Sequence, residues 1–207
     1  MFLTLFPIIS PIAFILIVTV LGFVTPGYSH INYTISRLAI EKYGWIQSLN
    51  FFQLAVAFST LGSTISSEFK ASSRLALRLI FSLTSLFLVV AGLFPTDPIE
   101  NIPLRFSLYT PVGLIHAGSV VLFVLVSPFG IHRLSAIMAG EPKYREYAMM
   151  TKTVGYLVFA GSILWFACFA LGIGLEYRGI TQKILIAVIL LWFTVMALIS
   201  RKNSRIR

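Results

Sequence analysis

Residues 88–106 read LVVAGLFPTDPIENIPLRF. An apolar run stops at Pro95, and Asp97 and Glu100 follow at once, although only 11% of the chain is charged. Proline lacks the amide hydrogen that a helix needs, and its ring clashes with the preceding turn, so Pro95 marks a helix end. The stretch therefore predicts an apolar helix followed by a polar turn, and this turn holds two of the seven acidic residues.

The composition of the whole chain predicts an integral membrane protein. Of the 207 residues, 57% are hydrophobic, and the mean hydropathy is +0.91. Soluble domains are typically about half apolar and about a quarter charged. The single cysteine, Cys168, excludes an intrachain disulfide.

Six apolar stretches are long enough to cross a membrane, which takes about 20 helical residues. Thr110-Pro111 is an N-cap followed by a proline at the first helical position, which suits the start of the fourth stretch. The predicted fold class is all-α, a polytopic membrane protein forming a single domain over residues 1–207. Its bundle of six transmembrane helices spans Leu3–Val24, Trp45–Ile65, Leu75–Phe94, Thr110–Gly130, Val154–Gly174 and Lys183–Ser200.

Two loops are long enough to form short interfacial helices. In the first loop, helical spacing relates Ile35, Leu38, Ala39 and Lys42, and Arg37 and Glu41 form an i,i+4 pair. In the fourth loop, an amphipathic pattern is broken by Glu141-Pro142; its apolar residues are Ile131, Leu134, Ile137 and Met138. Both segments are predicted to lie at the membrane surface.

Basic residues in short loops predict the orientation of the chain. Eleven of the 16 lie in the second loop, the fourth loop and the C-terminal tail: Lys70, Arg74, Arg78, Arg133, Lys143, Arg145, Lys152, Arg201, Lys202, Arg205 and Arg207. The other face has five: Arg37, Lys42, Arg105, Arg178 and Lys183. We therefore expect a multi-pass protein of the cell membrane with both termini in the cytoplasm. The basic rim explains the charge without nucleic acid, which is not predicted as a partner.

Polar residues gather on the predicted outer side. His116 lies about two turns, or roughly 9 Å, into the fourth span, where an imidazole needs a hydrogen-bond partner or a wet cavity. The turn at Asp97 joins the third and fourth spans, so Asp97 is expected to reach towards His116. The candidate ligand-binding residues are Tyr28, Ser29, His30, Ser36, Arg37, Asp97, Arg105 and His116.

Three motifs carry a family resemblance: TPGYSHINYTISRLAIEKYGW, GLFPTDP and GLIHAGS. With this placement, the chain resembles the six-span membrane family called domain of unknown function 998, over roughly residues 8–200. It is more distantly similar to the Frag1/DRAM/Sfk1 group, some of whose members are associated with lipid organisation. The resemblance implies no settled reaction. It implies that the family's signature positions are Ser29, Ser36, Phe94, Pro95, Asp97, His116 and Gly118.

The residues favour a non-enzymatic protein whose partners are membrane lipids. In this interpretation an outer-leaflet pocket of Asp97, His116, Arg37 and Arg105 holds a polar headgroup, because arginine carries a fixed fork of donors.

Two other functions remain open. The protein could be an intramembrane lipid hydrolase or transferase, with Ser29 or Ser36 as nucleophile beside His116 and Asp97, or with zinc on His30, His116 and Asp97. It could also be a structural subunit of a larger membrane complex. No metal and no cofactor is predicted, since no ligand spacing, Gly-rich phosphate loop or haem-attachment motif is present.

Overall fold

The computed structural model describes residues 2–99 and 105–204, and all regular structure in these ranges is helical. Glu100 of the opening stretch and the tail residues Arg205 and Arg207 lie outside these ranges. The long helices are α1 (Phe2–Val24), α2 (Gly44–Ser67), α3 (Ala71–Leu93), α4 (Pro111–Ala139), α5 (Arg145–Leu171) and α6 (Arg178–Ser204). The predicted all-α fold is confirmed.

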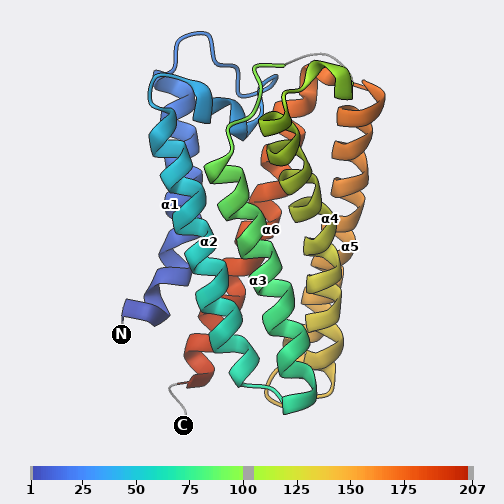
Figure 1. Ribbon diagram of the computed structural model, residues 1–207. Helices are drawn as coiled ribbons and strands as arrows, with labels where there is room; N and C mark the ends of the chain where they lie inside the picture. The colour runs from blue at the N-terminus through green and yellow to red at the C-terminus, as the bar shows by residue number, and fades with distance from the viewer. Residues whose placement is uncertain (1, 100–104, 205–207) are drawn as a thin grey trace.

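The long helices stand side by side in a closed ring (Figure 1). Each contacts the next along the chain, and α6 returns to contact α1. Both chain ends lie at one end of the bundle, which we call the terminal end. The opposite end, called the loop end, carries the short 3₁₀ helices η1 (Ile35–Ile40), η2 (Phe106–Leu108) and η3 (Leu175–Tyr177).

Five helices in the described residues are long and apolar enough to cross a membrane, which indicates an integral membrane protein. Their spanning segments are Leu5–Val24, Ala71–Leu93, Pro111–Ala139, Arg145–Leu171 and Leu175–Asn203. The exception is α2, which has 24 residues and no charged side chain. Its lower hydropathy therefore comes from neutral polar residues.

Three of the polar residues of α2 form a hydrogen-bonded ladder against α1. The amide of Asn50 donates to the carbonyl oxygen of Phe14 (3.2 Å) and to Gln47 Oε1 (3.3 Å). The amide of Gln53 donates to the carbonyl oxygen of Ser10 (3.2 Å) and to Asn50 Oδ1 (3.0 Å). Because Asn50 and Gln47 are buried inside the bundle, their polarity joins two helices.

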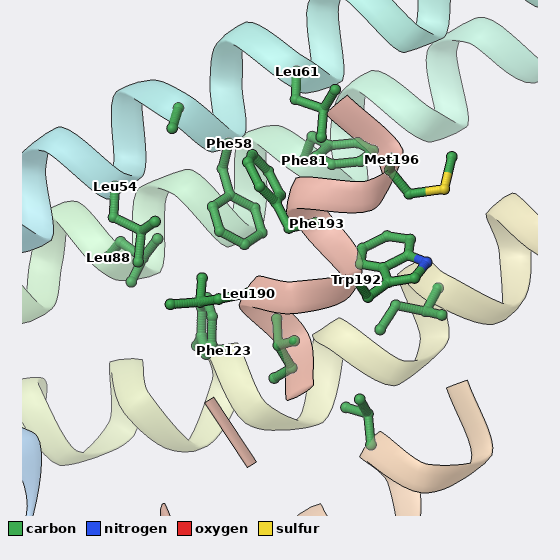
Figure 2. Packing of buried hydrophobic residues seen from close by; sticks show 14 of the residues in the cluster. Leu54, Phe58, Leu61, Phe81, Leu88, Phe123, Leu190, Trp192, Phe193 and Met196 are labelled. Carbon is green, nitrogen blue, oxygen red and sulfur yellow. The ribbon is translucent and has the colours of Figure 1, made fainter. Parts of the chain in front are cut away.

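Aromatic rings from several helices meet at the centre of the bundle (Figure 2). Phe58 of α2 lies against Phe193 of α6, with ring centroids 4.3 Å apart. Phe123 of α4 meets the same Phe58 ring at 6.0 Å, and Phe81 of α3 meets it at 6.5 Å. A Cβ atom on Gly62 would overlap the Phe81 side chain, so this glycine allows α2 and α3 to approach.

The structure corrects one predicted helix and confirms another. The separate helix expected in the fourth loop is wrong, because α4 continues without a break to Ala139. Its apolar residues Ile131, Leu134 and Met138 are at most 2% exposed, so their pattern extends the packed face of α4 instead of marking a surface helix. In the first loop, η1 is a short helix as predicted, although its place at a membrane surface stays a prediction.

We expect Asn50→Leu to lower the free energy of unfolding by about 1–2 kcal/mol, because it removes a donor from Phe14 and leaves the buried amide of Gln47 and the half-buried amide of Gln53 short of a partner. Thermal unfolding in detergent measures this change. The control is Ser59→Leu, which replaces an exposed polar residue of the same helix. An Asn50→Leu midpoint equal to that of the control would show that the ladder adds no stability.

Candidate functional site

The turn after α3 is fastened to the start of α4 by Asp97. Its Oδ2 accepts from the backbone amide of Thr110 (2.8 Å), and its Oδ1 accepts from the Thr110 hydroxyl (2.9 Å). Thr110 caps α4 as predicted, because its Oγ1 accepts from the amide of Gly113 (3.0 Å). The carboxylate thus stands at the positive end of the α4 dipole. Asp97 joins the turn to Thr110. It makes no hydrogen bond to His116, although we expected its side chain to reach towards that residue.

His116 of α4 completes the C-terminus of α3. Pro95 has no amide hydrogen, so the carbonyl oxygen of Ala91 lacks its usual helical donor. The Nδ1 atom of His116 lies 3.1 Å from that oxygen and 2.7 Å from the carbonyl oxygen of Phe94. Carbonyl oxygens only accept, so Nδ1 carries the hydrogen, and in the neutral ring Nε2 is left as an acceptor.

A cavity of about 40 Å³, which we call the loop-end cavity, lies beside the His116 ring. The ring of His116 is 2% exposed, and its Nε2 has no hydrogen-bond partner in the described part of the chain. The same holds for the indole Nε1 of Trp165 on α5, whose side chain is 3% exposed. The cavity is lined by Thr34, Ser36, Thr96, Ile99, Tyr109, His116, Ala117, Val120, Trp165, Phe169, Arg178 and Gln182.

A second cavity, also of about 40 Å³, adjoins the first and is almost entirely apolar. The two share Ser36, Val120 and Gln182 in their walls. Gln182 is fixed in place because its Oε1 accepts from the backbone amide of Ile35 (2.8 Å). We call the second space the core cavity; it reaches Phe51, Leu54, Phe87, Leu88 and Phe123.

The largest of these spaces is a groove of about 260 Å³ between α1 and α6, which we call the α1–α6 groove. Its walls are mostly apolar, and His30 and Lys183 mark its polar part. The residues that line it are Phe14, Ile15, Val18, Thr19, His30, Ile35, Lys183, Ile184, Ile186 and Ala187. Lys183 is the one charged residue of this lining.

The first loop is held against α6 beside this groove. The ammonium of Lys183 donates to the carbonyl oxygens of Tyr33 (2.6 Å) and His30 (3.0 Å), and it lies over the Tyr28 ring. The amide of Ile180 donates to the carbonyl oxygen of Ile31 (2.9 Å). A side chain at Gly179 would overlap this loop backbone, so glycine is needed for the close approach.

The predicted site residues do not form one pocket. Ser36 and His116 share the loop-end cavity, whereas His30 lines the α1–α6 groove. Tyr28 and Ser29 bond within the first loop: the Tyr28 hydroxyl donates to the carbonyl oxygen of Thr34 (3.0 Å), and the Ser29 hydroxyl donates to Asn32 Oδ1 (2.5 Å).

The predicted arginines also lie apart from the cavities. Arg37 pairs with Glu41 at 2.8 Å, as its spacing predicted, and Arg105 is exposed next to η2. Within residues 2–99 and 105–204, no three His, Cys, Asp or Glu side chains are grouped so that they could hold a metal ion. The zinc arrangement of His30, His116 and Asp97 therefore has no support in this geometry.

Sequence reasoning missed Trp165, Gln182 and Lys183 as site residues. Trp165 and Gln182 stand in apolar helices with no motif around them, and Lys183 was placed only at a helix edge. A signal existed for Gln182 and Lys183, because adjacent long polar side chains at the start of a predicted span need partners in the protein or at the membrane surface. No comparable signal marked Trp165, since a tryptophan is common in membrane helices.

Long apolar helices in a closed ring, with buried polar groups at one end, are the features of a polytopic helical membrane protein. The chain belongs to the family described as Protein of unknown function (DUF998), whose model matches residues 8–199. This confirms the family indicated by the three sequence motifs. No protein of curated function and no solved structure matches the chain.

We expect Asp97→Ala to lower the free energy of unfolding by about 1 kcal/mol, because it leaves the Thr110 amide and hydroxyl without their acceptor. Asp97→Asn should cost less, since the amide oxygen still accepts from the backbone. Gly113→Ala should be harmful in the native chain, because its Cβ would overlap the Asp97 carboxylate.

The double variant tests this explanation. With Asp97→Ala already present, Gly113→Ala should become neutral or stabilising, since alanine favours a helix over glycine by about 0.5–1 kcal/mol. Thermal unfolding of the four proteins gives the coupling. Additive effects would show that Asp97 does not act through the start of α4.

Proposed function

We propose that this protein is a six-span protein of the cell membrane that binds an anionic lipid in the α1–α6 groove. The observation that carries the proposal is the groove itself: it has mostly apolar walls from two membrane helices, and its polar residues are Thr19, His30 and Lys183. An acyl chain matches the walls, and the charge of Lys183, whose ammonium donates to the carbonyl oxygens of His30, Tyr33 and Gly179, attracts a negatively charged headgroup. In this proposal the site replaces the outer-leaflet pocket of Asp97, His116, Arg37 and Arg105 that the sequence favoured.

The six-span topology rests on α2. Its 24 residues extend about 36 Å at 1.5 Å per residue, which exceeds the hydrocarbon thickness of a bilayer. Its most polar side chains bond to α1 and are shielded from lipid. Because α2 has this length and stands between two apolar helices of the same ring, it crosses the membrane beside them in this proposal.

The orientation rests on the distribution of charge. The terminal end carries Lys70, Arg74, Lys143 and Arg145, and the tail adds Arg201 and Lys202. By the rule that short cytoplasmic loops are rich in lysine and arginine, this end faces the cytoplasm. The loop end, with the α1–α6 groove and the loop-end cavity near it, then faces outward.

His30 makes lipid binding depend on pH. Burial and, second, the charge of Lys183 lower the pKa of the His30 imidazole, so the ring is neutral at pH 7. An anionic headgroup in the groove would favour the protonated ring and raise this pKa. Binding then takes up a proton, and the affinity increases as the pH falls.

The test is to count bound lipid by native mass spectrometry after incubation with phosphatidylglycerol or phosphatidylcholine. We expect phosphatidylglycerol to be retained preferentially, and more at pH 5.5 than at pH 7.5. Ala187→Phe should reduce retention at least fivefold, because the new ring fills the groove between α1 and α6. Ala160→Phe, on the exposed face of α5, is the matched control.

His30→Gln should keep the preference for phosphatidylglycerol but lose its dependence on pH. Equal retention by Ala187→Phe and Ala160→Phe would refute the groove as the binding site. Equal retention of the two lipids would refute the role of the charge of Lys183.

The orientation has its own test. In a Cys168→Ala background, a membrane-impermeant maleimide added to intact cells should label Ser107→Cys, which is exposed at the loop end, and spare Ser72→Cys at the terminal end. The opposite labelling pattern would place the α1–α6 groove and both termini on the reverse sides of the membrane.

A further inference from the structure

We propose that the loop-end cavity binds an uncharged hydroxyl group, carried by an amphipathic molecule whose apolar part enters the core cavity. The hydroxyl site is separate from the α1–α6 groove, since the lining residues of the loop-end cavity and of the groove do not overlap, whereas the core cavity shares Phe14, Ile35 and Ile186 with the groove. The proposal therefore goes beyond binding of an anionic lipid and does not rest on it.

The hydrogen-bonding pattern of the loop-end cavity matches a hydroxyl. His116 gives its Nδ1 hydrogen to the carbonyl oxygens of Ala91 and Phe94, so its buried Nε2 offers a lone pair. Trp165 Nε1 can only donate, and it too is buried without a partner in the described part of the chain. One acceptor and one donor in the same wall suit a group that donates to the first and accepts from the second.

An anion fits this pattern less well. A carboxylate or phosphate ester dianion has acceptors only, so it would face the lone pair of His116 Nε2 without a hydrogen to offer. Arg178 also lines the cavity and is 3% exposed: its Nη2 donates to the carbonyl oxygen of Ile99 (3.2 Å), and its Nε and Nη1 are buried without a hydrogen bond in the described part of the chain. A hydroxyl satisfies His116 and Trp165 and requires no change of charge.

The size and polarity of the two cavities define the rest of the ligand. A water-sized group needs about 10–15 Å³ of such space, so about 40 Å³ admits a fragment of roughly three such groups. Ser36, Val120 and Gln182 line both the loop-end cavity and the apolar core cavity, so the two lie next to each other. A glycerol headgroup matches the loop-end cavity, and the first carbons of an acyl chain match the apolar core cavity next to it. The ligand class is a lipid alcohol such as a monoacylglycerol.

The experiment uses the full chain in phosphatidylcholine nanodiscs with a monoacylglycerol that carries a photoreactive diazirine near its glycerol end. After illumination, labelled peptides are identified by mass spectrometry. We expect labelling of core-cavity residues such as Leu88, Val120 and Phe123.

Two variants remove one hydrogen bond each while keeping the packing. His116→Asn leaves a donor for Phe94 and removes the second ring nitrogen. Trp165→Phe keeps an aromatic ring against Phe169, with which Trp165 is stacked at 5.4 Å between centroids. Each should reduce labelling about fivefold or more, the factor that corresponds to about 1 kcal/mol for a lost hydrogen bond. Trp45→Phe, the same substitution on an exposed residue, should not change it.

The controls separate the possible outcomes. Thermal midpoints establish that each variant is folded, and Ala187→Phe should label like the native chain, so failure of the groove proposal leaves this one standing. Competition by free glycerol would support the hydroxyl site with a free polyol as its ligand, while competition only by unlabelled monoacylglycerol would support a lipid. Stronger labelling by a diazirine fatty acid or lysophosphatidic acid, or equal labelling of His116→Asn, Trp165→Phe and Trp45→Phe, would overturn the proposal.

Discussion

The hydrogen bond between His116 Nδ1 and the carbonyl oxygen of Phe94, 2.7 Å long, is the contact on which the loop end depends. Pro95 ends α3 and leaves carbonyl oxygens without helical donors, and an imidazole from α4 supplies the hydrogen. This fixes the distance between the two helices at that height. It also fixes the tautomer of the ring, so the chemical character of the loop-end cavity follows from the way that α3 terminates.

The hydrogen bonds of the same turn explain why an acidic residue follows Pro95. Asp97 accepts from both the amide and the hydroxyl of Thr110, and the hydroxyl in turn accepts from Gly113. A carboxylate near a membrane is costly unless it is hydrogen-bonded. Here the start of a neighbouring helix provides donors and a favourable dipole, so the residue has a structural reason to be acidic.

The fold could be predicted from the sequence because long apolar runs and prolines determine helices and helix ends through local interactions. The runs give helices, and Pro95 and Thr110-Pro111 give their ends within a few residues. The candidate site was harder. Asp97 and His116 stood out because polar side chains are rare at that depth, but their partners depend on backbone carbonyls and on Thr110, which no spacing rule identifies. Trp165 acquires its significance only when α5 brings it beside α4. The fourth-loop helix failed because an amphipathic pattern cannot distinguish a membrane surface from a groove between helices.

The closed ring of helices has a consequence for biosynthesis. The seam of the ring lies between α1 and α6, and α1 leaves the ribosome long before α6. The α1–α6 groove therefore does not exist until α6 has been synthesised, and Lys183, which holds the first loop in place, arrives about 150 residues after its partners. A chain that lacks α6 has neither the groove nor the closed first loop, so occupation of the groove by a lipid would distinguish chains that contain α6 from chains that do not.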